Sequence, residues 1–238
     1  MVLEPRFVRG FTLTGDWYSI DIGKAIQSIG PQTILNSCYR DPVSKYCELV
    51  HRDATGRIAS IDNDYLNIGG QRAAGIDVGA RYDLSSLAGD LAASVDLSWL
   101  QRMDFELSDG KVLHAKGVYS GSTALFSALQ ATGRLSWRFR GASAGVAGRL
   151  VGSYKMCDDG DCSTPNALSR EVPAYATWDL FLGYTLKSVR GTSSVLLGVN
   201  NVLNQAPPLL YDSTSNNSNP STYDFVGRYA YLKLSHAL

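Results

Sequence analysis

The 238-residue chain lacks any long apolar run. A membrane-spanning helix needs about 18 or more consecutive apolar residues, so the sequence excludes one. It also lacks an excess of either charge, because 22 basic and 22 acidic residues cancel and the basic ones are scattered. Nucleic-acid-binding surfaces concentrate Lys and Arg. We therefore expect no nucleic-acid partner.

Histidine is scarce: the chain has only His51, His114 and His236. Two lie in loop-like stretches and the third in the last apolar segment, and no spacing to Ser or Asp supports a catalytic triad. We expect these side chains to be exposed or interfacial. The sequence thus predicts no catalytic residue, no enzyme activity and no cofactor.

What the chain has in abundance is alternation of apolar and polar residues. From Leu91 to Phe105 the odd positions are apolar except Gln101, whereas the even positions include Asp96, Arg102 and Asp104. Successive side chains of a β-strand point to opposite faces, so one face here is apolar and the other polar. The pattern recurs in 7–22, 72–84, 128–140 and 174–186, and the apolar faces carry all four tryptophans, Trp17, Trp99, Trp137 and Trp178.

Segments of this length and pattern are typical of transmembrane β-strands, which are apolar toward lipid and polar toward the lumen over about 9–11 residues. We therefore predict an all-β fold, an antiparallel transmembrane β-barrel segment of about eight strands. The alternative, a soluble β-sandwich, would have shorter strands with turn signals every 8–12 residues.

The periodicity places the strands at roughly 7–22, 57–84, 90–105, 127–140, 142–156, 172–186, 193–203 and 223–238. A helix is expected over 31–39, and Gly69-Gly70 predicts a bulge or kink in the second strand. Short connections follow the even-numbered strands and long ones the odd-numbered strands. In bacterial outer-membrane barrels the short turns are periplasmic and the long loops extracellular. The alternation of short and long connections therefore predicts that the short turns face the periplasm and the long loops the outside of the cell.

The four cysteines form two close pairs, Cys38/Cys47 and Cys157/Cys162, in loop-like stretches. Their even number and local pairing predict two disulfide-closed loops in an oxidising compartment. A metal site is the alternative, since Asp158, Asp159 and Asp161 could bind a cation such as calcium. No histidine lies near them in the sequence, and a solvated acidic loop tip is the simpler interpretation.

Several segments together resemble the TonB-dependent outer-membrane receptors. They are 10–26, 30–39, the Asn-x-Gly kink in 65–78, 172–180, the GVNNVLNQAPP stretch at 198–208, and the closing strand 224–238. The resemblance implies that residues 1–238 are the C-terminal segment of such a receptor's barrel, which has 22 strands around a plugged lumen. One departure is Leu238, where the family's chain usually ends in Phe.

The resemblance also implies a function: uptake of a scarce, bulky nutrient such as an iron–siderophore complex, cobalamin or an oligosaccharide. This segment would supply barrel wall and extracellular loops in the Gram-negative outer membrane. Its partners would be lipid and lipopolysaccharide, the plug domain and remaining barrel strands, the nutrient, and the TonB complex through the N-terminal part.

The residues themselves leave two other functions open. One is an independent eight-stranded barrel acting as an adhesin or anchor, which the even strand number permits. The other is a barrel enzyme such as a lipase or protease, although no convergent His, Ser and Asp set supports it. The first residues, MVLEPRFVRG, hold no apolar signal-peptide core. We therefore expect a processed chain or a piece of a longer one.

Overall fold

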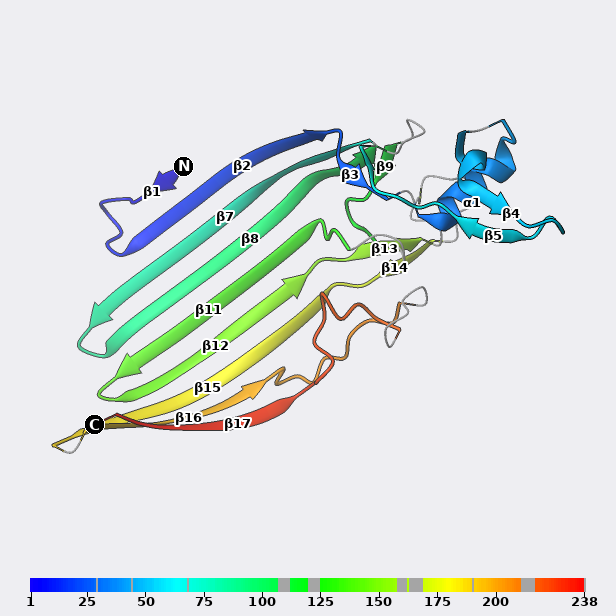
Figure 1. Cartoon of the computed structure of the whole chain (residues 1–238). Coiled ribbons are helices and arrows are strands. Elements are labelled where there is room, and N and C mark those ends of the chain that lie inside the picture. The colour runs from blue at the N-terminus through cyan, green and yellow to red at the C-terminus, as the bar shows by residue number, and fades with distance from the viewer. Residues whose placement is uncertain are drawn as a thin grey trace. The chain divides into compact units, whose positions relative to one another are not determined.

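The computed structural model describes residues 1–28, 30–43, 45–67, 69–106, 112–119, 125–157, 162, 169–189, 191–210 and 217–237. Long antiparallel strands lie side by side in one main sheet (Figure 1). In spatial order these are β1 (Val2–Leu3), β2 (Phe11–Gly23), β7 (Gly70–Ser86), β8 (Gly89–Glu106), β11 (Leu129–Phe139), β12 (Ala142–Val151), β15 (Tyr175–Ser188), β16 (Gly191–Asn200) and β17 (Tyr229–Ala237), and β9 (Val112–His114) pairs with β8.

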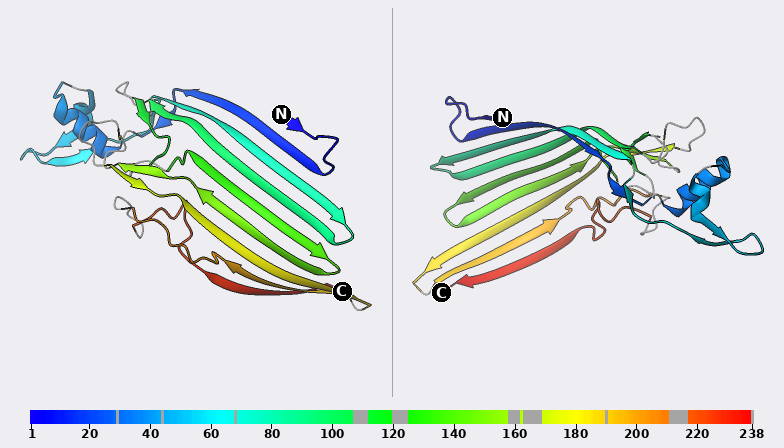
Figure 2. Two further views of the ribbon diagram at one scale, coloured as in Figure 1. Left: turned by 180° about the vertical axis from the view of Figure 1, so that it is seen from behind. Right: turned by 45° about the horizontal axis from the view of Figure 1, so that its top comes forward.

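Eight of these strands have nine or more residues, and they are the eight that the alternation predicts. Consecutive long strands are neighbours throughout, which makes the sheet a simple up-and-down meander. The further views in Figure 2 show the same order from behind and with the top tilted toward the viewer. The predicted all-β antiparallel fold is therefore confirmed.

The chain divides into two compact units. The first comprises Met1–Ser19, Ala73–Met103 and His114–Leu238, and holds most of the main sheet. The second comprises Ile20–Arg72 and Asp104–Leu113, and holds mainly the long connection between β2 and β7. Each unit is described by itself below.

Short turns close the hairpins at one end of the sheet. Phe139 pairs with Ala142, which leaves a two-residue turn of Arg140 and Gly141. Both turn residues have positive φ, 47° and 88°. Two positive φ angles in a two-residue hairpin define a type I′ turn, whose twist matches that of the flanking strands. The predicted tight turn at Gly141 is confirmed.

One predicted strand is broken at a glycine, and the last strand is shorter than predicted. The segment predicted as one strand over 57–84 forms β5 (Ile58–Ile61), β6 (Leu66–Asn67) and the start of β7. Gly69 has φ 75°, which an extended strand does not accommodate, so the break falls at the predicted Gly69-Gly70 kink. The last strand starts at Tyr229 rather than 223, because Asp224 accepts a hydrogen bond from the Val226 N–H at 2.8 Å and Gly227 has φ 73°.

The segment predicted as one strand over 142–156 changes sheets. After β12 ends at Val151, β13 (Tyr154–Cys157) pairs in parallel with β10 (Val118–Tyr119) and antiparallel with β14 (Ser169–Val172). The Gly152 N–H still donates to the Leu129 carbonyl at 2.8 Å, so the change begins beyond that bond. This small sheet joins segments of two long connections, β8 to β11 and β12 to β15.

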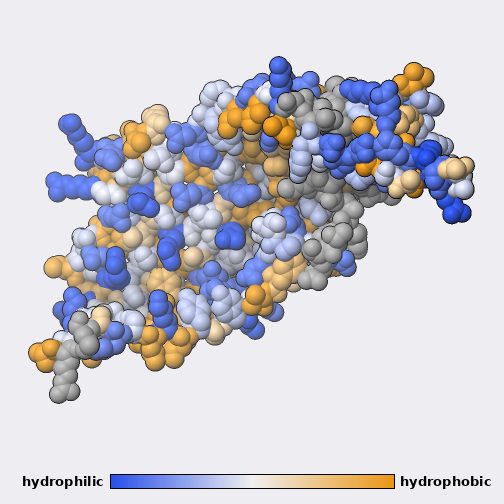
Figure 3. Space-filling model, in the orientation of Figure 1, coloured by the Kyte–Doolittle hydropathy of each residue, from blue (hydrophilic) through white to orange (hydrophobic). Residues whose placement is uncertain are grey.

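The register confirms the predicted faces of the main sheet. Directly opposed residues share a face, and one row across the sheet runs Leu135, Val146, Leu180 and Val199. Its neighbours carry exposed side chains: Leu182 is 61% and Leu232 62% accessible. A soluble sandwich would bury this face in its core, so that alternative is not supported. Figure 3 shows hydrophilic and hydrophobic side chains together on the visible surface.

The second unit is built around a disulfide-linked helix. Helix α1 (Pro31–Arg40) matches the predicted 31–39, and is followed by the 3-10 helix η1 (Lys45–Leu49). Cys38 of α1 is bonded to Cys47 of η1, with their Cα atoms 4.8 Å apart. Two short ladders complete the unit: β3 (Ile26–Gln27) pairs with β6, and β4 (Val50–Arg52) pairs with β5. No described helix is long and apolar enough to cross a membrane.

Candidate functional site

The polar face of the main sheet carries the first candidate site. Its register brings together polar residues from four strands. One row is Asp96, Thr132, Arg149 and Thr177, and a second is Ser94, Arg134 and Asp179, with the small Ala147 between the last two. Alternation within 91–105, 128–140 and 174–186 predicts that Asp96, Arg134 and Asp179 lie on the polar face, and the register confirms that they share it. In a barrel this face would line the lumen.

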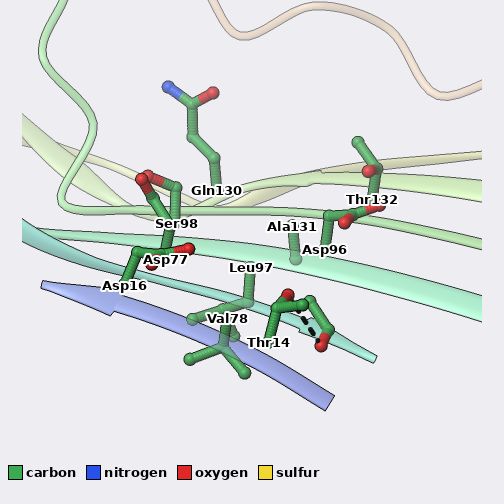
Figure 4. Close-up of a pocket in the computed structure, with 11 residues that line it drawn as sticks. Thr14, Asp16, Asp77, Val78, Asp96, Leu97, Ser98, Gln130, Ala131 and Thr132 are labelled. Carbon is green, nitrogen blue, oxygen red and sulfur yellow. Dashed lines mark hydrogen bonds between the residues drawn. The ribbon is translucent and has the colours of Figure 1, made fainter. Parts of the chain in front are cut away.

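An acidic groove of about 310 Å³ opens on the polar face (Figure 4). Asp16 of β2, Asp77 of β7 and Asp96 of β8 contribute carboxylates, and Thr14, Ser98, Gln130 and Thr132 contribute neutral polar groups. Asp16 also forms an ion pair with the Met1 amino group at 3.4 Å. Asp77 and Asp96 have no such partner among the ion pairs of the described residues, so the groove keeps a negative potential.

Gly79 keeps the acidic groove open. A Cβ at this position would lie 2.6 Å from the Thr14 hydroxyl oxygen and 3.2 Å from a carboxylate oxygen of Asp96. The Thr14 hydroxyl instead donates to the Gly79 carbonyl at 3.2 Å. A side chain here would displace one of the two polar groups. The glycine on β7 therefore lets Thr14 of β2 and Asp96 of β8 approach each other over its backbone.

A second groove, of about 360 Å³, lies farther along the same face and has mixed charge. Arg134 and Arg149 line it together with Asp179 and Asp224. The guanidinium of Arg134 lies 5.9 Å from the ring centroid of Phe181, within reach of a cation–π contact. The wall thus changes from acidic at β2–β8 to mixed at β11–β15.

Asn201 shapes the edge of this mixed groove. It is 3% exposed, has φ 46°, and its side chain both accepts from the Gln205 N–H and donates to the Gln205 carbonyl. Its own N–H donates to the Asp179 carboxylate at 2.8 Å. Asn tolerates the left-handed conformation better than other side chains. These contacts account for the second Asn of the GVNNVLNQAPP stretch.

On the predicted adjacent strands 127–140 and 142–156, the sequence predicts a lumen-facing basic stripe of Arg134, Arg138, Arg140, Arg149 and Lys155. Such a stripe would attract anionic ligands or pair with plug carboxylates, and the simpler expectation is a hydrated face paired locally with Asp and Glu. The structure does not bring the five residues into one surface. Lys155 lies on β13 in the small sheet, and Arg140 lies in the turn, where its guanidinium stacks on Phe139. Among described residues, no carboxylate lies within 4.0 Å of the charged group of any of the five. Local pairing with Asp and Glu, the simpler expectation, is therefore not seen either.

The second candidate site is an apolar core within the long connections. Its buried residues come from the small sheet, from the end of β12, from the start of β15 and from the β16–β17 connection. They are Tyr119, Val151, Tyr154, Met156, Val172, Tyr175, Leu210 and Tyr223. We call this set the loop core. Tyr175 and Tyr223 meet edge to face with ring centroids 4.9 Å apart. Three of the long connections therefore share one core.

Burial changes the acidity of the tyrosines in the loop core. Desolvation raises the pKa of Tyr154 well above its usual value, and the hydrogen bond with Tyr223 adds to the shift. Burial likewise raises the pKa of Tyr223. Both hydroxyls are thus held in the neutral, hydrogen-bonding form. The alternation of apolar and polar residues does not reveal this core, because its residues lie in short, irregular segments. The signal that the sequence does offer is the cluster of aromatic and β-branched residues in these segments.

The other predicted site residues fall in separate places. Cys157 is fully buried and bonded to Cys162, with Cα atoms 5.5 Å apart. His51 contacts Asp62 at 2.8 Å, and His236 contacts the Ser193 hydroxyl at 2.9 Å, on different elements. No group of metal ligands occurs in the described part of the chain. The aspartates of the alternative cation site, 158, 159 and 161, lie outside the described residues.

The geometry defines a class: a long-stranded antiparallel meander with an exposed apolar face, a polar face and long connections at one end. The sequence matches the family of TonB dependent receptor-like β-barrels over residues 6–202. The chain therefore belongs to this family, whose members are outer-membrane receptors and transporters.

Solved structures share this fold. The FrpB iron transporter from Neisseria meningitidis (F3-3 variant) is similar with TM-score 0.57 and 18% identity, over 95% of this chain and 28% of that one. The siderophore receptor PirA from Acinetobacter baumannii gives TM-score 0.56 and 12% identity, over 97% and 29%. A mutant of the ferric enterobactin receptor PfeA from Pseudomonas aeruginosa gives 0.57 and 18%, over 95% and 29%.

The chain thus spans less than a third of the length of these structures. At identities this low, the similarity shows a shared fold and does not identify the transported nutrient. The comparison with curated proteins found no match. An independent small barrel is not favoured, since the matched structures are long receptors of which this chain corresponds to one part.

Proposed function

We propose that residues 1–238 form the C-terminal wall and extracellular loops of a TonB-dependent receptor in a Gram-negative outer membrane. The receptor would take up a scarce, bulky nutrient, and the segment would act in transport and not as an enzyme. The family match over residues 6–202 is the observation that carries this proposal. The plug, the remaining strands and the contact with the TonB complex would come from other parts of the receptor.

Among the nutrient classes, an iron–siderophore complex is favoured over cobalamin and oligosaccharides. The similar structures are named as an iron transporter, a siderophore receptor and a ferric enterobactin receptor. The loop core suits a capture role, because it combines three connections into one packed body that can present loop surface without a large ordering cost on binding.

The test is uptake by cells in which the native gene carries an in-frame deletion of residues 1–238. We expect loss of uptake of radiolabelled ferric siderophore and poor growth under iron restriction, with recovery on complementation. A strain without TonB is the matched control and should show the same loss. Loss of cobalamin or oligosaccharide uptake alone would reassign the nutrient, and unchanged uptake of all three would contradict the proposal.

A further inference from the structure

The end of the β11–β12 hairpin is recessed beside its neighbour. The last β12–β15 pair is Ala142 with Tyr184, but β15 continues to Ser188. The Thr185 N–H still donates to the Gly141 carbonyl at 2.8 Å. Beyond that bond β15 projects past the turn, so a notch forms at the short-turn end of the sheet. By the rule for outer-membrane barrels, this end is periplasmic.

The notch is a groove of about 690 Å³ with both cationic and apolar walls. Its charged residues are Arg138, Arg140 and Lys187 against the single carboxylate of Asp90. None of the three cations has a described carboxylate within 4.0 Å of its charged group. The groove therefore has a net positive charge, and its volume lies within the range of about 300–1,000 Å³ that is usual for ligand sites.

The apolar wall continues the lipid-facing surface. Phe139, Tyr184 and Leu186 line the groove, and the last two are 50% and 56% exposed. Arg140 stacks on Phe139 with its Cζ 4.9 Å from the ring centroid, and Phe139 stacks in turn on Trp137. Aromatic residues mark the interfaces of outer-membrane barrels. In a barrel inserted in the membrane, a guanidinium on such a stack would lie at the depth of the lipid headgroups.

We propose that this notch binds an anionic phospholipid of the periplasmic leaflet. Arg140 and Lys187 would hold the phosphate, since cations at a membrane surface attract anionic headgroups and Arg pairs well with phosphate oxygens. Lys187 belongs to the polar face of β15, opposite Tyr184 and Leu186, but it lines the notch where β15 projects past the end of β12. An acyl chain would follow Tyr184 and Leu186 along the exposed apolar face. The site depends on the membrane orientation of the barrel and not on the identity of its nutrient.

The test uses the native polypeptide that carries this chain, purified in detergent, with native mass spectrometry as the readout. The probes are dioleoylphosphatidylglycerol, the zwitterionic dioleoylphosphatidylcholine, and inorganic phosphate as competitor. The test variant combines Arg140→Asn, which suits the left-handed φ of 47°, with Lys187→Gln. The control variant, Arg52→Gln with Arg57→Gln, removes the same charge from the β4–β5 hairpin, far from β11–β12 in the sequence.

One cation near an anionic headgroup corresponds to about fivefold in affinity. We therefore expect the test variant to lose affinity for phosphatidylglycerol by at least about fivefold, with phosphatidylcholine and the control variant unaffected. Lys187→Gln alone should lower the affinity in the same direction, which guards against misfolding at the turn. Equal binding of the two lipids, an equal loss in the control, no loss in either variant, or full displacement by inorganic phosphate would each overturn the proposal.

Discussion

The hydroxyl groups of Tyr154 and Tyr223 are hydrogen-bonded at 2.9 Å, although the two residues are 69 positions apart. Tyr154 belongs to the β12–β15 connection and Tyr223 to the β16–β17 connection. Both side chains are buried, so the bond is shielded from water and joins two loops inside the loop core. It provides a direct means of testing whether the connections behave as one body.

Removing this hydrogen bond should loosen both loops. A Tyr154→Phe variant leaves the Tyr223 hydroxyl buried without its partner, at a cost of about 1–3 kcal/mol. We expect faster limited proteolysis of both connections. Adding Tyr223→Phe should restore part of the loss, because no hydroxyl then remains unsatisfied. Tyr65→Phe, at a 78% exposed position, is the control; equal sensitivity of all variants would contradict the shared loop core.

The same pair predicts a loss of stability in alkali. The folded-state pKa values of Tyr154 and Tyr223 are raised by burial above the unfolded value of about 10. Stability from these groups is therefore complete below pH of about 10 and is lost as the pH rises toward their folded-state values. Proteolytic protection of the loops should fall in this range. The Tyr154→Phe, Tyr223→Phe variant should show a smaller pH dependence.

Opposite faces of β11 should tolerate charge differently. Leu135 lies on the apolar face, and an Arg on the lipid face near the membrane midplane costs about 2–4 kcal/mol. Leu135→Arg should therefore impair assembly, measured by heat-modifiable migration and surface labelling of the native polypeptide. Ser136→Arg, one residue along on the polar face, should have a much smaller effect. Equal tolerance of the two substitutions would refute the assignment of faces.

Gly198 should resist enlargement because an aromatic ring covers it. A Cβ there would clash with the Tyr231 ring, and the nearest atoms all belong to that side chain. We expect Gly198→Ala to destabilise the sheet by about 1–3 kcal/mol, as overpacking usually does. Tyr231→Ala should relieve much of this cost in a double-mutant cycle. Gly133→Ala is the matched control, since its neighbours begin at 3.8 Å; no difference between the two glycines would count against the packing.

The disulfide pairing has a chemical test. Mass spectrometry of non-reduced peptides from envelope-derived protein should yield Cys38–Cys47 and Cys157–Cys162 links. Loops this short are expected to stabilise by roughly 2–3 kcal/mol each in the chain-entropy description. Cys38→Ser with Cys47→Ser should therefore make α1 and η1 more sensitive to protease. Cross-paired peptides or four free thiols would contradict the assignment.

Much of the main sheet could be predicted from the sequence because its signal is local. Alternation assigns Leu135 and Leu180 to one face and Arg134 and Asp179 to the other, and the register agrees. Strand boundaries depend on left-handed residues that precede a strand. Gly69, with φ 75°, lies at the predicted Gly69-Gly70 kink, whereas the apolar pattern does not reveal that Gly227, with φ 73°, delays the start of β17 to Tyr229.

The sites were predicted less well because they depend on distant residues. The basic stripe fails at Lys155, since β13 leaves the main sheet to pair with β10. Nothing in the local sequence shows this pairing, because it depends on a segment 37 positions earlier, where Val118 lies opposite Lys155. Strand pairing over such a sequence separation depends on the side-chain packing that the paired strands form, here the loop core around Tyr119 and Met156.

The sequence by itself determined the strand type, the two faces and the alternation of short and long connections, because the side-chain period of a strand follows from backbone geometry alone. Only the tertiary structure decided that three connections share the loop core, that Asp16, Asp77 and Asp96 meet in one groove, and that Arg140 stacks beside a notch at the short-turn end of the sheet. The physical reason is that strand register and loop packing bring together residues that no sequence period relates.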